Sequence, residues 1–277
     1  MRVTESEMLQ IAELVEDLCG IVLDQTKGYL VENRLGDMLS RTGCGDYSEL
    51  VERVRAGEDD WLRSSVINSI TTQETLFFRD QSPFDALRHK VLPEIFDSKE
   101  RASGPSRLRV WCAACSTGQE PYSVAMVLQE LLGNFTGWDL EILGTDISDT
   151  ALMQASAGVF GDLEVRRGLS TDELNRNFIR DGDSWKVKPH LREIVRFERR
   201  NLLDSFATLG EFDIIFCRNV AIYFRPEARR DLYRRLVTKL EPGGHLFTSS
   251  SESLRDVDPC FRPELHCRSV FYRPNLI

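Results

Sequence analysis

The most informative stretch of the sequence is Trp111-Cys-Ala-Ala-Cys-Ser-Thr-Gly-Gln-Glu-Pro-Tyr-Ser123. An apolar run at 108–115 ends in small residues, and a helix is expected to begin at once near Glu120, with Pro121 at a first-turn position. Small side chains at such a turn let a ligand approach the backbone, and the start of the helix offers free amide hydrogens. Because Gly118 is its only glycine, the pyrophosphate cradle G-x-G-x-x-G is missing, and a tight strand-to-helix turn without a ligand is the alternative interpretation.

The segments that follow this turn alternate between strands and helices. Apolar runs at 140–147 and 212–220 predict strands, and each is followed by a helical pattern. Further strands are expected at 245–249 and 267–272. Because strands that alternate with helices form parallel sheets covered on both faces, the chain from 108 to 277 predicts an α/β domain.

One segment interrupts this alternation. Residues from about 158 to 200 are largely polar, and 193–199 alternate as in a strand. We therefore expect a small antiparallel β-subdomain, inserted between the second and third strands of the core.

The beginning of the chain has the pattern of a small helical domain. Thr4 and Glu7 form a capping box ahead of apolar residues at helical spacing. A second helix is expected over roughly 25–41, and Asp46 with Glu49 could cap a third. A fourth helix is expected to carry five apolar residues: Trp61, Leu62, Val66, Ile67 and Ile70.

These patterns divide the chain into three parts. Residues 1–75 form the helical N-terminal domain, 76–107 a connector, and 108–277 the α/β domain with its insert. Within the connector, a helix is expected between Phe77 and about residue 95, followed by a polar loop or linker at 98–106.

The composition is that of an ordinary globular protein. Hydrophobic residues make up 42% of the 277 residues and charged ones 29%, which excludes a disordered chain, a fibre and a bare coiled coil. Lysine plus arginine number 35 and aspartate plus glutamate 44, so the net charge is −9. A chain this acidic is not expected to bind nucleic acid.

No uncharged apolar run is long enough to span a bilayer, and the first ten residues lack the apolar core of a signal peptide. We expect a cytoplasmic protein without direct membrane insertion.

The seven cysteines are scattered and odd in number, which fits reduced thiols better than a disulfide framework. Cys112 and Cys115 form a C-x-x-C motif, but no second pair or nearby histidine completes a zinc site. We expect no metal. Simple packing of small residues at a strand end is the favoured interpretation of this pair, and a redox or metal role is the alternative.

Polar residues lie at the expected carboxyl ends of the strands. Asp146 ends the second strand, where nucleoside-binding sheets hold ribose hydroxyls, although it could instead cap the next helix. Arg218, Asn219 and Tyr223 follow a later strand in an otherwise apolar run, where a functional role explains them better than exposure to solvent. Arg79 follows two phenylalanines that would anchor it in a core, and it is either a placed cation or a paired surface one.

Five sequence blocks, in this order, resemble the CheR family, the chemotaxis receptor methyltransferases. They are 71–80, 111–123, 144–147, 212–224 and Ser250-Ser-Glu252, and the resemblance covers nearly the whole chain. It implies a Rossmann-like, S-adenosylmethionine-dependent methyltransferase domain with a small antiparallel β-subdomain insert, preceded by an all-α N-terminal domain. It also implies methyl transfer to glutamate side chains of chemoreceptors, with S-adenosylhomocysteine as the product and the receptors' cytoplasmic methylation helices as the partner.

The resemblance assigns site residues as well. Catalytic roles fall on Arg79, Arg218 and Tyr223, which are able to orient a carboxylate. Matched by motif, the cofactor contacts are Gln73, Thr75, Arg79, Glu120, Asp146, Asn201, Leu202, Cys217 and Arg218. The family more often has asparagine where this chain has Gln73. A glutamate carboxylate is already a nucleophile near neutral pH, so the reaction needs positioning and desolvation rather than a general base.

Other functions fit the sequence less well. A nucleic-acid methyltransferase should show a basic groove, and an NAD-dependent dehydrogenase should have the glycine fingerprint. The main alternative is a non-catalytic S-adenosylmethionine-sensing module, which would keep Asp146 and Glu120 but lose the arginine–tyrosine set.

Two features bear on receptor binding. Lys27, Arg34 and Arg41 recur every seven residues on the second helix and form a stripe that either docks the receptor or is a solvated face. Some family members bind a receptor C-terminal pentapeptide through a longer, glycine-rich loop of the subdomain. Here 179–186 carries acidic residues and a single glycine, Gly182, so we predict pentapeptide-independent docking. A trimmed loop that still binds the peptide by backbone pairing is the alternative.

Overall fold

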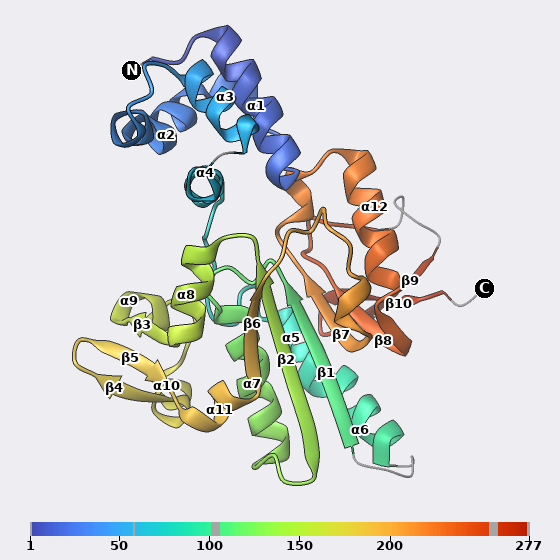
Figure 1. Ribbon diagram of the computed structural model, residues 1–277. Helices are drawn as coiled ribbons and strands as arrows, with labels where there is room; N and C mark the ends of the chain where they lie inside the picture. Colours follow the sequence, from blue (N-terminus) through green and yellow to red (C-terminus); the bar gives the residue numbers. More distant parts are fainter. Residues whose placement is uncertain (1, 58, 101–105, 255–259, 276–277) are drawn as a thin grey trace.

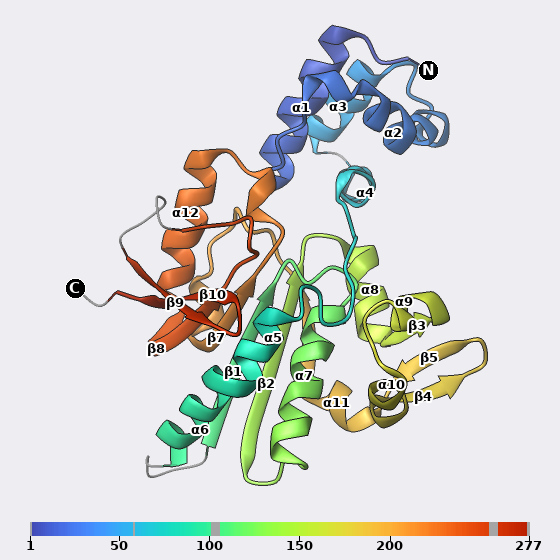
Figure 2. The ribbon, with the colours of Figure 1, turned by 180° about the vertical axis from the view of Figure 1, so that it is seen from behind.

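The computed structural model describes residues 2–57, 59–100, 106–254 and 260–275. A helical domain formed by the start of the chain sits at one end of a larger α/β domain (Figure 1). The carboxyl ends of the central strands point toward the helical domain in both views (Figures 1 and 2).

The helical domain consists of α1 (Glu5–Cys19), α2 (Gly28–Thr42), α3 (Tyr47–Ala56) and α4 (Asp60–Ile70). The capping box of Thr4 with Glu7 and the cap by Asp46 are confirmed, since both side chains accept backbone N–H bonds at their helix starts. The predicted helix at 25–41 begins late, because 25–27 form a separate 3₁₀ turn. Of the apolar residues on the fourth helix, Trp61 is 50% exposed and lies under the Arg41 guanidinium.

The connector differs from its prediction at both ends. Its helices are α5 (Ser82–Ala86), a π-helical turn (Leu87–Val91) and α6 (Leu92–Glu100). Residues 77–81 are not helical, because Phe78, Asp80 and Gln81 all have positive φ. At the other end α6 continues through Glu100 into the segment predicted as a linker, and 101–105 lie outside the described residues.

The main sheet has seven strands in the order β6-β2-β1-β7-β8-β10-β9. Its parallel strands are β6 (Val195–Arg199), β2 (Trp138–Asp146), β1 (Ser106–Ala113), β7 (Phe212–Cys217) and β8 (Leu240–Phe247). The sheet is not purely parallel, since β10 (Ser269–Pro274) and β9 (Phe261–His266) pair antiparallel at one edge. They form a hairpin that no sequence pattern had separated into two strands.

Each face of this sheet is covered by its own apolar cluster. Alternation along β1 sends Val110 and Cys112 to one face and Trp111 and Ala113 to the other. The first face packs against α5, α6 and α7 (Gln119–Leu132), which lie in front of β1 and β2 in Figure 2. The second packs against α12 (Pro226–Val237). A parallel sheet buried on both faces is the predicted architecture, and it is confirmed for the central strands.

The insert is a three-stranded antiparallel sheet in the order β3-β5-β4. It comprises β3 (Val159–Gly161), β4 (Phe178–Asp181) and β5 (Ser184–Val187), with α9 (Asp162–Arg166), α10 (Thr171–Asn177) and α11 (Pro189–Glu193). The expected strand at 193–199 does not belong to it. That strand is β6, which pairs parallel with β2 in the main sheet. The insert therefore ends earlier than the predicted 200.

Candidate active site

A pocket of about 950 Å³, counting the space that opens to solvent, lies at the carboxyl edge of the main sheet. The ends of β1, β2 and β7 form its floor, and the segment at 71–79 forms one wall. Cys19 and Ile21, at the end of α1, also line it, so the helical domain contributes to the pocket. Its position suits a nucleoside-sized ligand at the crevice of an open α/β sheet.

The structure brings nearly all the predicted site residues to this one pocket. Tyr223 lines it together with the following predicted cofactor residues: Gln73, Thr75, Arg79, Glu120, Asp146, Asn201, Leu202 and Arg218. Cys217 is the exception, because it is fully buried at the end of β7 and is not part of the lining.

Asp146 ties together two turns beside the pocket. Its Oδ2 accepts the N–H of Ser116 at 2.8 Å, and its Oδ1 accepts that of Ser148 at 2.9 Å. Burial raises the pKa of this carboxyl. The alternative role of helix cap belongs to Ser148 instead, whose hydroxyl accepts the N–H of Ala151 at the start of α8 (Asp149–Ala157). Asp146 is thus left as an acceptor at the tip of β2.

The turn between β1 and α7 is tight because of close packing behind it. Gly118 has a φ of +94°, and a Cβ there would lie 2.8 Å from the Cβ of Ala155. Ser116 also takes a positive φ, and its hydroxyl donates to the Gln73 carbonyl at 3.0 Å. The small residues of the turn between β1 and α7 therefore allow the 71–79 segment to lie directly over it.

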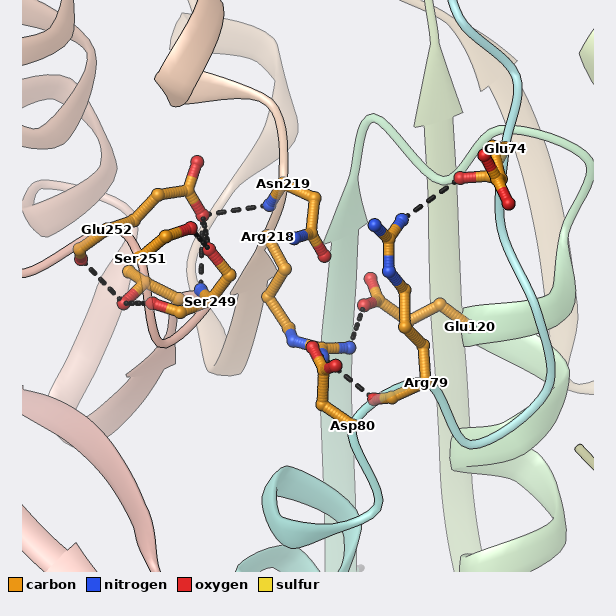
Figure 3. A network of polar contacts seen from close by, with 10 residues as sticks. Glu74, Arg79, Asp80, Glu120, Arg218, Asn219, Ser249, Ser251 and Glu252 are labelled. Carbon is orange, nitrogen blue, oxygen red and sulfur yellow. Dashed lines mark hydrogen bonds and ion pairs between the residues drawn. The ribbon is translucent and has the colours of Figure 1, made fainter.

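A buried arginine joins three parts of the pocket wall. Arg218 is 6% exposed, and its Nη1 lies 3.0 Å from Glu120 Oε2. Its Nη2 donates to the Arg79 carbonyl and to Asp80 Oδ2, both at 2.8 Å (Figure 3). Burial raises the pKa of Glu120, and the facing Arg218 opposes that rise. Both terminal nitrogens of Arg218 thus bind protein groups, and the side chain holds three segments of the pocket wall together.

Arg79 is held at the pocket by its neighbours in the chain. Phe77 and Phe78 are buried, as predicted, and the Phe78 N–H donates to the Ser123 hydroxyl at 3.0 Å. The Arg79 guanidinium extends beside Glu120 and donates to the Glu74 carbonyl at 3.0 Å (Figure 3). It is therefore a placed cation of the pocket, anchored by the buried rings that precede it.

The amides of Gln73 and Asn201 bind protein groups around the rim. Gln73 Nε2 donates to the Ser148 hydroxyl at 2.8 Å. Asn201 Nδ2 donates to the Leu18 carbonyl at 2.8 Å, which fixes the end of α1 against the α/β domain. Both side chains thus shape the lining by joining separate segments.

Tyr223 lies at the boundary between two hollows. It is 41% exposed, and its carbonyl accepts the N–H of Val22 at 2.9 Å. The second hollow, of about 690 Å³, lies against the helical domain and includes Lys27 and Arg34 in its lining. Arg34 donates to the Thr72 hydroxyl at 3.3 Å and to the Ile70 carbonyl, so this member of the predicted stripe serves first to hold the domain's last helix.

Two carboxylates of the site were not predicted. Asp80 follows Arg79 directly, and its pairing with Arg218 joins segments 138 residues apart, which no local pattern reveals. Glu252 accepts hydrogen bonds from the turn after β7. Its block, Ser250-Ser-Glu252, is one of the five that resemble the family, but the local sequence indicates no role for the glutamate.

Comparison with known proteins gives a consistent result. The model of the CheR methyltransferase SAM-binding domain matches residues 73–267, and that of the CheR all-alpha domain matches 6–71. The chain belongs to the CheR methyltransferase family. It is 42% identical over 264 residues to chemotaxis protein methyltransferase 1 of Pseudomonas aeruginosa, covering 94% of each chain. It is 43% identical over 249 residues to the chemotaxis protein methyltransferase Cher2 of Pseudomonas putida, covering 88% of this chain and 89% of that one.

This CheR methyltransferase is an enzyme that uses S-adenosylmethionine for methylation in chemotaxis. The predicted family and fold class are thereby confirmed, with the all-α domain and the methyltransferase domain in the expected order. Within the described ranges no group of three or more His, Cys, Asp or Glu residues is arranged to hold a metal ion. In that same part of the CheR chain, no helix combines the length and the apolar character that crossing a bilayer requires.

Proposed function

We propose that this enzyme transfers the methyl group of S-adenosylmethionine to glutamate side chains of chemoreceptors in the cytoplasm, converting each carboxylate into a methyl ester. The observation that carries the proposal is the pocket at the carboxyl edge of the sheet, where Asp146, Glu120 and Arg79 meet in a chain of this family. The relatives' names, as chemotaxis protein methyltransferases, support a receptor as the substrate.

Three side chains of the pocket match the polar groups of the cofactor. The buried carboxylate of Asp146 suits the ribose hydroxyls, and the carboxylate of Glu120, which lines the same pocket, suits the methionine ammonium. Arg79 suits the methionine carboxylate, because the terminal nitrogens of Arg218 are already bound to protein groups. The residues present therefore fit this cofactor.

Bound S-adenosylmethionine supplies a methyl group made electrophilic by its sulfonium. The glutamate of the receptor is ionised near neutral pH and needs no base to activate it. The protein's task is to align the two groups and to exclude water. Tyr223 stands at the rim, half exposed, where its hydroxyl is available to the incoming carboxylate. Arg218 holds the carboxylates of Glu120 and Asp80 in place, and Arg79 is available to the methionine carboxylate.

The receptor's methylation helices are expected to approach along the second hollow. This hollow adjoins the cofactor pocket at Tyr223 and presents Lys27, a cation suited to the acidic surroundings of a target glutamate. Arg34 is committed to Thr72 and Arg41 lies over Trp61, so Lys27 carries most of the charge attraction we assign to the stripe.

We also propose that the enzyme does not need a receptor pentapeptide. The strands β4 and β5 are joined through Gly182 and Asp183 alone, which leaves no extended loop to embrace a peptide. Asp181 precedes this turn and Asp183 is part of it, and both carboxylates would repel a terminal carboxylate. Titration of a receptor C-terminal pentapeptide should give no heat of binding. Micromolar binding localised to 179–200 would contradict this.

The main test uses S-adenosylmethionine labelled in its methyl group and membranes that contain chemoreceptors. The receptor should become labelled, and mild base should release the label as methanol, because methyl esters hydrolyse while methylated amines do not. Membranes that carry a receptor with its target glutamates changed to alanine are the control. Label that resists base, or that appears equally on the control receptor, would refute glutamyl methylation.

A further inference from the structure

Glu252 is a buried carboxylate held by backbone amides. It is 2% exposed. Its Oε2 accepts the N–H groups of Asn219 (2.8 Å) and Ser249 (3.1 Å) and the Ser249 hydroxyl (2.7 Å). Its Oε1 accepts the N–H groups of Val220 (3.1 Å) and Ile222 (3.2 Å). Amides that converge in this way form an anion-binding nest, and here the anion is a side chain of the same protein.

The nest belongs to the turn that forms one wall of the pocket. Asn219, Val220 and Tyr223 line the pocket and all lie on this turn. Asn219 has a φ of +58°, in the left-handed region that few residues other than glycine adopt, although asparagine tolerates it better than most. Three N–H groups of the turn converge on the two oxygens of this carboxylate and lose their acceptor if it is removed. The shape of the turn therefore depends on the carboxylate of Glu252.

We propose that Glu252 is a positioning residue for methyl transfer: it holds the 219–222 turn in the shape that presents Asn219 and Tyr223 to the pocket. Figure 3 shows its place on one side of Asn219, with Arg218, Asp80 and Glu120 on the other. The wall is thus held on one side by the ion pairs of Arg218 and on the other by the backbone amides that bind Glu252. The proposal rests on the cofactor site proposed above.

The competing view is that Glu252 only closes its own local turn with Ser249 and adds stability. Glu252→Gln separates the two, because it keeps the size of the side chain. Both oxygens of Glu252 accept backbone N–H groups, so the amide nitrogen of glutamine faces a donor in either orientation. The matched control is Val127→Ala, a core truncation about two turns along α7 from Glu120 that touches no part of the nest.

The first measurement compares binding and turnover at equal stability. Each protein is assayed at the same interval below its own thermal midpoint, with S-adenosylhomocysteine binding followed by calorimetry. We expect Glu252→Gln to lower kcat/KM for methylation by about 10-fold or more, and to weaken binding of S-adenosylhomocysteine by a few-fold, since several hydrogen bonds to a charged group change together. Val127→Ala should change neither.

The second measurement follows the turn itself by hydrogen exchange. The amides of Asn219, Val220 and Ile222 should exchange about 10-fold faster in Glu252→Gln than in the parent, and at the parent rate in Val127→Ala. If Glu252→Gln does not fold, Ser249→Ala serves instead. It removes one donor to Oε2 and should speed exchange of the same amides about 2-fold.

The outcomes separate the two proposals. A folded Glu252→Gln that binds and turns over like the parent, or whose turn amides exchange at the parent rate, overturns the positioning role. The same holds for unchanged exchange in Ser249→Ala. A parent protein that does not bind S-adenosylhomocysteine would refute the proposed cofactor site instead.

Discussion

Replacing Asp146 should weaken cofactor binding and also loosen the two turns that its carboxylate holds. Each of its oxygens already accepts one backbone N–H, from Ser116 and from Ser148. A carboxylate oxygen has a second acceptor position, so both remain able to accept a ribose hydroxyl. A hydrogen bond to a charged group contributes about 1.5–3 kcal/mol. Asp146→Ala should therefore raise the Kd for S-adenosylhomocysteine by about 10- to 150-fold.

The assay must separate the ribose contact from the loosening of the two turns that Asp146 also holds. Calorimetry with S-adenosylhomocysteine and with its 2′,3′-dideoxy analogue does so, as a double-mutant cycle between protein and ligand. The parent should lose affinity for the analogue, whereas Asp146→Ala should bind both ligands alike. Asp149→Ala, which removes a nearby carboxylate paired with Arg199, is the control and should bind as the parent does. Equal losses for the analogue in parent and variant would refute the ribose assignment.

Further changes should act as follows. Arg79→Ala and Tyr223→Phe should each lower receptor methylation by about 10-fold or more with little change in thermal midpoint, and parent rates in both folded variants would exclude a catalytic role. Burial lowers the pKa of His245 from 6.5 to about 3, so the unfolded chain takes up a proton first as the pH falls below 6.5. The contribution of His245 to the free energy of unfolding is therefore fully present above that pH and should fall by about 2 kcal/mol between pH 7 and pH 5. Urea denaturation should show a smaller fall in His245→Phe, and an equal fall would exclude His245 as the cause. Gly144→Ala would place a Cβ 2.7 Å from the Phe197 ring and should cost about 1–3 kcal/mol by overpacking, which a thermal midpoint at the parent value would contradict.

Much of the fold could be predicted because its signals are local. The capping box at Thr4 and the apolar run of β1 followed by small residues depend on neighbours in the chain, and both were predicted correctly. The strand at 195–199 was also visible, but its partner was not. The alternation of apolar and polar residues predicts a strand with two different faces, but it does not indicate which sheet the strand joins. Only the pairing with β2 places it in the core.

The site was predictable to the extent that it follows strand ends. Asp146 was placed correctly beside the pocket because a polar residue ending a parallel strand lies at the carboxyl edge of the sheet. Arg218 was also expected there, but its partners Asp80 and Glu120 come from distant segments, so its role in holding these segments together could not be inferred. Glu252 satisfies amides of another turn, and nothing in its local sequence marks those amides as needing an acceptor.

The first helix of the chain ends at the wall of the pocket proposed for the cofactor. Leu18 offers its carbonyl to Asn201, Val22 donates to Tyr223, and Glu16 pairs with Arg225. A pocket that two domains build together obeys thermodynamic reciprocity: whatever docks on the helical domain and changes how it meets this wall alters cofactor affinity, and the cofactor alters the affinity of that docking by the same factor. Exchanging the helical domain for that of another member of the family should therefore change how tightly the enzyme binds S-adenosylhomocysteine at the proposed site.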